Sequence, residues 1–235
     1  MRHYFTFNGI RSDEYGIYIT GGAIHGAPVR SIEEITIPGR DGVLTIDNGR
    51  FEPISHVYEA YVHDSFDSNV QSFRNAIMAQ RGHLRLIDTF HTDEFYLAYY
   101  EKGLEVDPYQ TLRHGTFQVT FTRDPRRFLV SGETTTTLTA NGSITNPTLF
   151  ASKPLIRITG TGTVGIGSHT VTITSANSYT DIDCEMMDAY KGTVNCNANI
   201  QLSGDEFPTL EPGTNGITLG SGITKVAITP RWFRL

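Results

Sequence analysis

One glycine-rich segment has the spacing of a dinucleotide-binding loop. Gly160, Gly162 and Gly165 spell G-x-G-x-x-G directly after an expected strand, and Asp181 lies about where a ribose-binding acid would stand. Such a loop binds pyrophosphate only when a helix N-terminus follows it. Here residues 167–174 alternate polar and β-branched side chains, which is typical of another strand. We therefore interpret the motif as a glycine-rich β-hairpin and expect no cofactor.

The histidines and cysteines do not form a recognisable catalytic or metal-binding pattern. His63 and Asp64 are adjacent, and His91 lies shortly before Asp93. Neither spacing places two ligands on one helix face, and no third ligand stands nearby. The sequence also has no G-x-S-x-G elbow and no cysteine in a nucleophile context. We expect no catalytic residue and no metal, so the protein is predicted not to be an enzyme.

Two further groups of reactive or charged side chains are interpreted as structural. Cys184 and Cys196 flank an expected hairpin turn, which leaves a disulfide open, although two buried thiols are expected in a reducing compartment. A short basic cluster precedes the expected domain boundary, and we expect it to be solvated. It consists of Arg123, Arg126 and Arg127.

Composition excludes several classes of protein. The 235 residues carry a formal net charge of -6, which argues against a nucleic-acid-binding surface. No segment has the roughly 18 consecutive apolar residues of a membrane span. The first residues lack the apolar block of a signal peptide, so we expect synthesis in a cytoplasm.

The amino-acid composition of the chain changes near Asp124 and Pro125, and a proline ends a preceding strand. We therefore predict two domains, 1–130 and 131–235. In the first, period-two alternation predicts half-buried strands around Ile35 and Ile37, across 56–61 and across 116–121. Val70, Phe73 and Ile77 recur at helical spacing and predict a helix over 68–81 that Gly82 ends.

The second half reads as strands separated by glycine, asparagine and proline. Alternating apolar pairs at 156/158, 171/173 and 226/228 indicate an antiparallel sandwich of the jelly-roll or lectin type. The predicted fold class is therefore mostly β: a split-barrel or sheet domain with one helix, followed by a β-sandwich.

An ordered set of short fragments along nearly the whole chain resembles the distal tail proteins of siphovirus bacteriophages. One of them is the P-G-R-x-G motif that follows a strand, formed by Pro38, Gly39, Arg40, Asp41 and Gly42; each fragment is weak alone, and the ordered set is strong. Glycine at such positions permits the positive φ of tight chain reversals. The fragments span 7–10, 12–17, 35–42, 117–121 with 124–125, 144–147, 153–158, 181–183, 207–215 and 226–232.

The resemblance implies a structural role in a virion. Family members form a hexameric ring at the tail tip, and two rings can stack. The first domain would make the belt of the ring, and the second, a galectin-like sandwich, would point outward. The implied partners are the tail tube protein, the tail-associated lysin or spike hub, and receptor-binding or other baseplate proteins. Assembly would take place in the host bacterial cytoplasm, from a phage or a prophage gene.

We further hypothesise that the loop from Pro38 to Gly42 contributes to contacts between subunits. An alternative interpretation is a lectin-like adhesion module that binds cell-wall saccharides through the second domain, with Tyr179 and Tyr190 as stacking residues. A third, a tail hydrolase that cuts wall polymers, would need paired carboxylates or a nucleophile with a base, and no such pair is evident.

Overall fold

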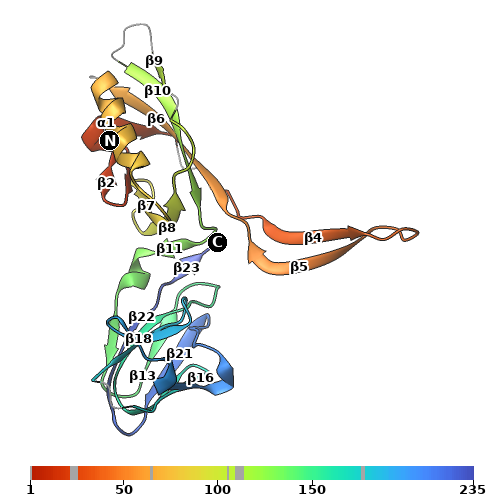
Figure 1. Cartoon of the computed structure of the whole chain (residues 1–235), viewed down its shortest axis with the longest axis vertical. Coiled ribbons are helices and arrows are strands. Elements are labelled where there is room, and N and C mark those ends of the chain that lie inside the picture. Colours follow the sequence, from red (N-terminus) through yellow and green to blue (C-terminus); the bar gives the residue numbers. More distant parts are fainter. Residues whose placement is uncertain (1, 22–25, 64–65, 105, 109–113, 176–177) are drawn as a thin grey trace. The chain divides into compact units, whose positions relative to one another are not determined.

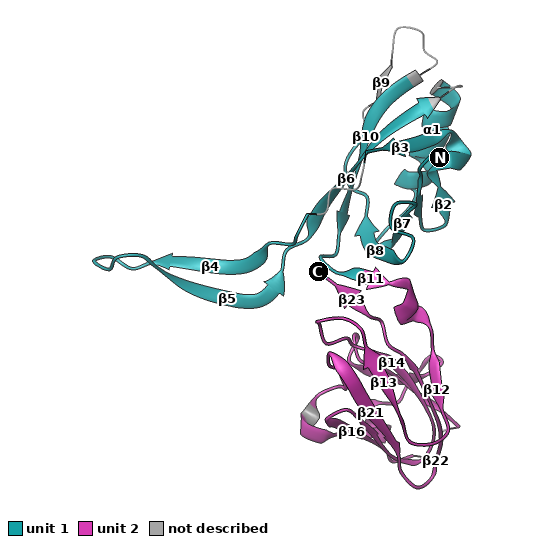
Figure 2. Ribbon diagram, turned by 180° about the vertical axis from the view of Figure 1, so that it is seen from behind, with its two compact units in different colours: residues 1–127, 235 teal, residues 128–234 magenta. Residues whose placement is uncertain are grey.

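The computed structural model describes residues 2–21, 26–63, 66–104, 106–108, 114–175 and 178–235. The chain divides into two compact units, coloured separately in Figure 2. Unit 1 comprises Met1–Arg127 together with Leu235, and unit 2 comprises Phe128–Arg234. The described residues are mostly strand and hold a single α-helix, so the predicted fold class is confirmed.

An antiparallel sheet forms the body of unit 1. Its strands run in the order β2-β1-β7-β8-β10-β6-β3, with β9 on the outer part of β10. Their bounds are β1 (Phe5–Phe7), β2 (Ile10–Arg11), β3 (Ile17–Thr20), β6 (Ile54–His63), β7 (Leu84–Asp88), β8 (Glu94–Tyr99), β9 (Val106–Pro108) and β10 (His114–Arg123), with the 3-10 helix η1 (Ser12–Tyr15) between β2 and β3.

The sheet of unit 1 curls back on itself. The amide of Ile19, in β3 at one end of the strand order, donates to the carbonyl of His3 just before β1, at 2.8 Å. Because β1 lies near the opposite end of that order, this bridge brings the two ends together as a split half-barrel. Residues that alternate along β6 and β10 fill the interior, among them Tyr58, Val119 and Phe121.

Helix α1 (Phe66–Met78) covers this interior. Val70, Phe73 and Ile77 are buried in the core of unit 1, as their spacing predicted. The helix begins and ends earlier than the predicted 68–81. Its last turn tightens through an i→i−3 hydrogen bond from Gln80 to Ile77, so the chain leaves helical geometry before Gly82, which has φ +84.

One of the three clustered arginines is buried, contrary to the expectation that all are solvated. Only 2% of Arg123 is exposed, and its guanidinium lies 4.5 Å from the ring centroid of Tyr96. Burial lowers the pKa of Arg123. Nearby, Tyr58 donates a 2.9 Å hydrogen bond to the buried carboxylate of Asp88. The position of Arg123 on the inward face of β10 explains the difference, because strand periodicity rather than charge density sets its direction.

Unit 2 consists of two packed antiparallel sheets. One has the order β12-β22-β14-β17-β18-β19 and the other β13-β21-β15-β16-β20. The strands are β12 (Thr136–Leu138), β13 (Gly142–Asn146), β14 (Leu155–Gly160), β15 (Gly162–Ile166), β16 (His169–Ile173), β17 (Thr180–Asp183), β18 (Asp188–Lys191), β19 (Val194–Asn195), β20 (Ile200–Leu202), β21 (Gly213–Leu219) and β22 (Ile223–Thr229).

Short elements complete unit 2. They are β11 (Arg127–Leu129), which starts at the unit boundary and pairs with β23 (Phe233–Arg234), and the 3-10 helices η2 (Val130–Glu133), η3 (Asn197–Asn199) and η4 (Ser203–Asp205).

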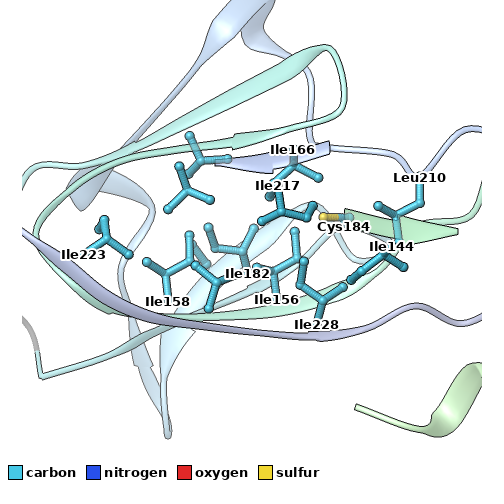
Figure 3. Packing of buried hydrophobic residues seen from close by; sticks show 14 of the residues in the cluster. Ile144, Ile156, Ile158, Ile166, Ile182, Cys184, Leu210, Ile217, Ile223 and Ile228 are labelled. Carbon is cyan, nitrogen blue, oxygen red and sulfur yellow. The ribbon is translucent and has the colours of Figure 1, made fainter. Parts of the chain in front are cut away.

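Isoleucine-rich layers from both sheets meet in the core of unit 2, as Figure 3 shows. Ile156, Ile182 and Ile228 come from one sheet and Ile166 and Ile217 from the other, and each is fully buried. The alternation that predicted strands at 156/158, 171/173 and 226/228 is therefore confirmed.

The single tryptophan and both cysteines also belong to the core of unit 2. Trp232 packs in it. Cys184 and Cys196 are buried free thiols, and burial raises the pKa of Cys184 to about 12.

The G-x-G-x-x-G motif lies where two backbone segments pass close together. Gly160 and Gly162 have φ of +108° and +140°, and a Cβ at Gly160 would overlap the carbonyl oxygen of Gly222. The motif leads into the antiparallel hairpin β15–β16, which confirms the hairpin interpretation. The glycines are needed for close backbone packing and left-handed conformation.

Candidate interaction surface on the arm

Two strands of unit 1 leave its sheet. β4 (Arg30–Thr36) and β5 (Val43–Phe51) pair with each other and with no other described strand. Figure 1 shows them as a long two-stranded hairpin that extends away from the curled sheet before β6 begins. We call residues 29–52 the arm. A two-stranded hairpin without a third strand or a packed helix has little stability of its own in water. We therefore expect a partner to pack against the arm.

The predicted site residues form the tip of the arm. Pro38 to Gly42 make the reversal between β4 and β5, with Gly39 and Gly42 at φ +83° and +79° and the amide of Arg40 donating to the carbonyl of Ile37 at 3.1 Å. All five residues are exposed. The structure therefore brings the motif together as one protruding loop, while its part in contacts between subunits stays a prediction.

The strand register gives the arm two unlike faces. Ile35 pairs with Leu44 and Glu33 with Ile46, and side chains two residues apart share a face, so one face carries an apolar stripe. The exposed fractions in this stripe are 37% for Ile35, 38% for Ile37, 42% for Leu44 and 42% for Ile46. The opposite face is more polar: it pairs Glu34 with Thr45, Ile32 with Asp47 and Thr36 with Val43.

Ionic and aromatic contacts fix the base of the arm. Arg30 binds Asp47 at 2.8 Å and its guanidinium lies 4.9 Å from the ring centroid of Phe51. The hydrogen bond from the amide of Gly49, followed by that from Arg30, lowers the pKa of Asp47. A register shift between Arg30 and Ile32 adds a bulge on β4. These contacts order the base of the arm, and the stripe nearer its tip stays outside both core clusters of the described residues.

The prediction of half-buried strands is wrong for Ile35 and Ile37. Their alternation predicted a strand, and β4 includes Ile35 and ends one residue before Ile37. Neither side chain belongs to a buried core of the described residues, because the hairpin stands apart from the sheet. An alternating pattern indicates which side chains favour burial. It does not indicate whether residues of the same chain or of another chain bury them. The apolar stripe as a surface was therefore missed; the paired alternation of Leu44 and Ile46 after the P-G-R-x-G loop is the signal that could have revealed it.

The other chemically suggestive residues do not form a site. His91 lies 3.3 Å from Asp88, which also accepts the backbone amides of Phe90 and His91, so this histidine belongs to a turn. Asp64 lies outside the described residues. Across the ranges that the structure describes, no three metal-ligating side chains cluster. No helix in these ranges combines the length and apolarity that crossing a membrane requires.

The fold can be compared with solved structures. The chain superposes on the crystal structure of Dit (gp 19.1) of phage SPP1 with a TM-score of 0.76 over 100% of both chains, at 13% identity. The chain shares the fold of a Dit protein. The resemblance to distal tail proteins drawn from the sequence is thereby confirmed at the level of the fold.

Sequence comparison does not add to the Dit likeness. No family model and no curated protein matches the chain. The baseplate of phage p2 in its activated conformation with Sr also aligns, at 8% identity over 96% of this chain and 97% of the other, with a TM-score of 0.47. A score this low supports no argument, so the Dit fold rests on the SPP1 comparison.

Proposed function

We propose that the protein is a structural component of the tip of a long, non-contractile phage tail, where copies of the chain form a closed ring. The observation that carries this proposal is the uncovered apolar stripe on the arm of a chain with the Dit fold. The SPP1 protein is described as a paradigm of the hub adsorption apparatus of phages that infect Gram-positive bacteria. Such a part is a scaffold, so we propose no enzymatic activity.

A neighbouring copy of the chain is the best candidate to cover the arm. The arm and the sheet of unit 1 are different surfaces, so a contact between them on two copies is head-to-tail. Head-to-tail contacts close into a ring when the rotation that relates neighbouring copies is a whole fraction of 360°. We propose a ring of six copies. The unpaired edges of β4 and β5 also have backbone groups that a neighbour's strand can bind.

The two predicted domains receive different tasks in this proposal. Domain 1–130, which carries the arm, would form the belt of the ring, and the galectin-like domain 131–235 would face outward. One side of the ring would meet the tail tube protein and the other the tail-associated lysin or spike hub, with receptor-binding or other baseplate proteins outside. The protein would then reside in the virion after assembly in the bacterial cytoplasm, and two rings can stack back to back.

The test is the solution mass of the purified chain by light scattering, with negative-stain imaging of the same sample. We expect rings of six subunits, or pairs of them, and a double variant Ile35→Thr with Leu44→Thr should remain monomeric. The matched control, Ile32→Thr with Val43→Thr, changes the opposite face of the arm and should weaken assembly less. A wild-type chain that stays monomeric with and without its tail tube protein would refute the ring.

A further inference from the structure

The outer face of the six-stranded sheet in unit 2 aligns several polar and aromatic residues in one row. Across the sheet, Ala227 of β22 pairs with Arg157 of β14, Arg157 with Asp181 of β17, and Asp181 with Tyr190 of β18. Neighbouring residues of each strand, such as Ile156 and Ile182, point into the core. The row therefore faces away from the sandwich interior.

The centre of this row is an arginine–carboxylate pair with a fixed geometry. Arg157 donates to Asp181 through Nε at 2.6 Å and through Nη2 at 2.8 Å. The guanidinium also lies 4.5 Å from the ring centroid of Tyr179, and Nζ of Lys191 lies 5.5 Å from the same ring. Two hydrogen bonds and a ring contact hold the guanidinium plane in one orientation, although about half of the Arg157 side chain stays exposed.

Beside the pair lies a surface hollow of about 250 Å³. Leu155, Ala227 and the methyl-bearing Thr229 give it a small, partly apolar wall, and Thr135 bonds Thr229 hydroxyl to hydroxyl at 2.7 Å. Arg157 and Asp181 line the same hollow. Its volume is below the roughly 300–1,000 Å³ of pockets for drug-sized ligands, so it fits a single small ring rather than a large cofactor.

The groups that line the hollow match the chemistry of vicinal hydroxyls. A guanidinium has five N–H donors and a carboxylate has about four lone-pair positions, so the Arg157–Asp181 pair keeps donors and acceptors free, side by side. A hydroxyl both donates and accepts, and two adjacent hydroxyls can bond both members of the pair. The apolar wall of Leu155 and Ala227 lies beside these polar groups and suits the C–H face of a sugar ring.

The arginines of this sheet face are each paired with a carboxylate. Arg157 is neutralised by Asp181, and Arg231 is neutralised by Asp183 on the next row of the same sheet. Two lysines also lie near the hollow: Lys191 beside the ring of Tyr179, and exposed Lys225, two residues before Ala227 on β22. The two groups at the centre of the hollow therefore offer a ligand hydrogen bonds from a pair without net charge, and the phosphate-bearing probe in the experiment below tests whether the lysines attract an anionic ligand instead.

We propose that this hollow binds one pyranose ring of a neutral saccharide, with Arg157 and Asp181 bonding adjacent hydroxyls. Binding of this kind gives unit 2 a direct, weak contact with a polysaccharide surface, in addition to any scaffold role. The inference does not rest on ring formation, because all of its residues lie in unit 2.

The experiment is saturation-transfer NMR and calorimetry on the full chain, with a panel of neutral hexose disaccharides and one phosphate-bearing polyol polymer as probes. We expect millimolar binding of at least one neutral disaccharide. Arg157→Lys should weaken it at least tenfold, because lysine keeps the charge but loses the two-point geometry. Ala227→Leu should also abolish it by filling the hollow without removing a hydrogen-bonding group.

The matched control is Arg11→Lys in unit 1. Arg11 bonds Asp13 through Nε and Nη2 and lies 4.6 Å from the ring centroid of Tyr4, so it repeats the arrangement away from the hollow. This variant should bind saccharide as the wild type does. The proposal is overturned if no neutral disaccharide binds, if only the phosphate-bearing polymer binds, or if folded Arg157→Lys and Ala227→Leu retain full affinity. Loss of rings with saccharide binding intact would refute only the proposed function.

Discussion

Arg231 donates two hydrogen bonds to Asp183, through Nη1 at 2.7 Å and through Nη2 at 2.8 Å. The same carboxylate accepts the backbone amides of Glu185 and Met186, each at 3.1 Å. Arg231 itself adopts a positive φ of +59°, which a non-glycine residue rarely does. Asp183 therefore ties the turn after β17 to the segment between β22 and β23 and holds that segment in a strained backbone conformation.

Replacing this carboxylate should destabilise unit 2. Asp183→Asn keeps the size of the side chain but loses the charged bonds to a partly buried arginine, so we expect a loss of about 2 kcal/mol in the free energy of unfolding. Trp232 is the only tryptophan and is buried in unit 2, so its fluorescence during urea unfolding measures this unit. The control Asp13→Asn breaks an exposed pair in unit 1 and should leave the tryptophan transition unchanged.

The carboxylate of Asp183 should also make the stability of unit 2 depend on pH. Burial acts to raise the pKa of Asp183, but the hydrogen bonds from Arg231 and from the amide of Met186 outweigh it, so the pKa lies below its ordinary value near 3.8. A depressed folded-state pKa contributes stability that is present above the unfolded value and is lost as pH falls through the folded one. The tryptophan-monitored midpoint should fall steeply below about pH 4, and the slope should be shallower in Asp183→Asn. Equal slopes would show that other carboxylates control acid unfolding.

A methyl group at the glycine crossing should disrupt unit 2. Gly160→Ala would place a Cβ against the carbonyl of Gly222 at a φ of +108°, so we expect a loss of about 2 kcal/mol or more, or failure to fold. Gly216→Ala in β21 is the control, because a Cβ there meets nothing within 4 Å. Urea midpoints of the two variants, read by tryptophan fluorescence, should differ clearly. Similar midpoints would mean that the two backbones can move apart at low cost.

The apolar stripe of the arm should contribute little to the stability of the free subunit. Ile35→Thr with Leu44→Thr should change the unfolding free energy of the monomer by about 0.5 kcal/mol or less, because no core covers these side chains. Ile77→Ala, in the buried face of α1, should cost about 2–5 kcal/mol. Circular dichroism melts of dilute, monomeric samples would compare them. A large loss in the arm variant would reveal packing within the chain.

Much of the fold follows from local pattern. Alternation located the strands at 156/158 and 226/228 because both sheets of unit 2 bury one face, and that burial is what selects period-two apolar residues. The helix was found from Val70, Phe73 and Ile77, but its end was displaced because an i→i−3 bond closes the last turn before the glycine. The order of the strands in each sheet could not be predicted from local sequence patterns, because it depends on contacts between residues distant in sequence.

The surfaces were harder to predict than the core. Side-chain preference places Ile35 and Leu44 opposite each other but does not say whether their cover comes from the same chain. Arg157 and Asp181 are separated by 24 positions and meet only through the pairing of β14 with β17. A site built from such pairs becomes visible once the register is known, whereas the tip loop around Pro38 and Gly42 was visible as a continuous motif.

An exposed β-ribbon is also a substrate for proteases, because an enzyme can bind its open edges and cut its tip. If neighbouring subunits cover the arm as proposed, a subunit outside a ring has a cleavable segment that a subunit inside one protects. Unassembled chains would then be short-lived in the infected cell, and the pool of hub subunits would be enriched in those already committed to a ring. The exposed hairpin would in this way make the lifetime of each subunit depend on its assembly into a ring.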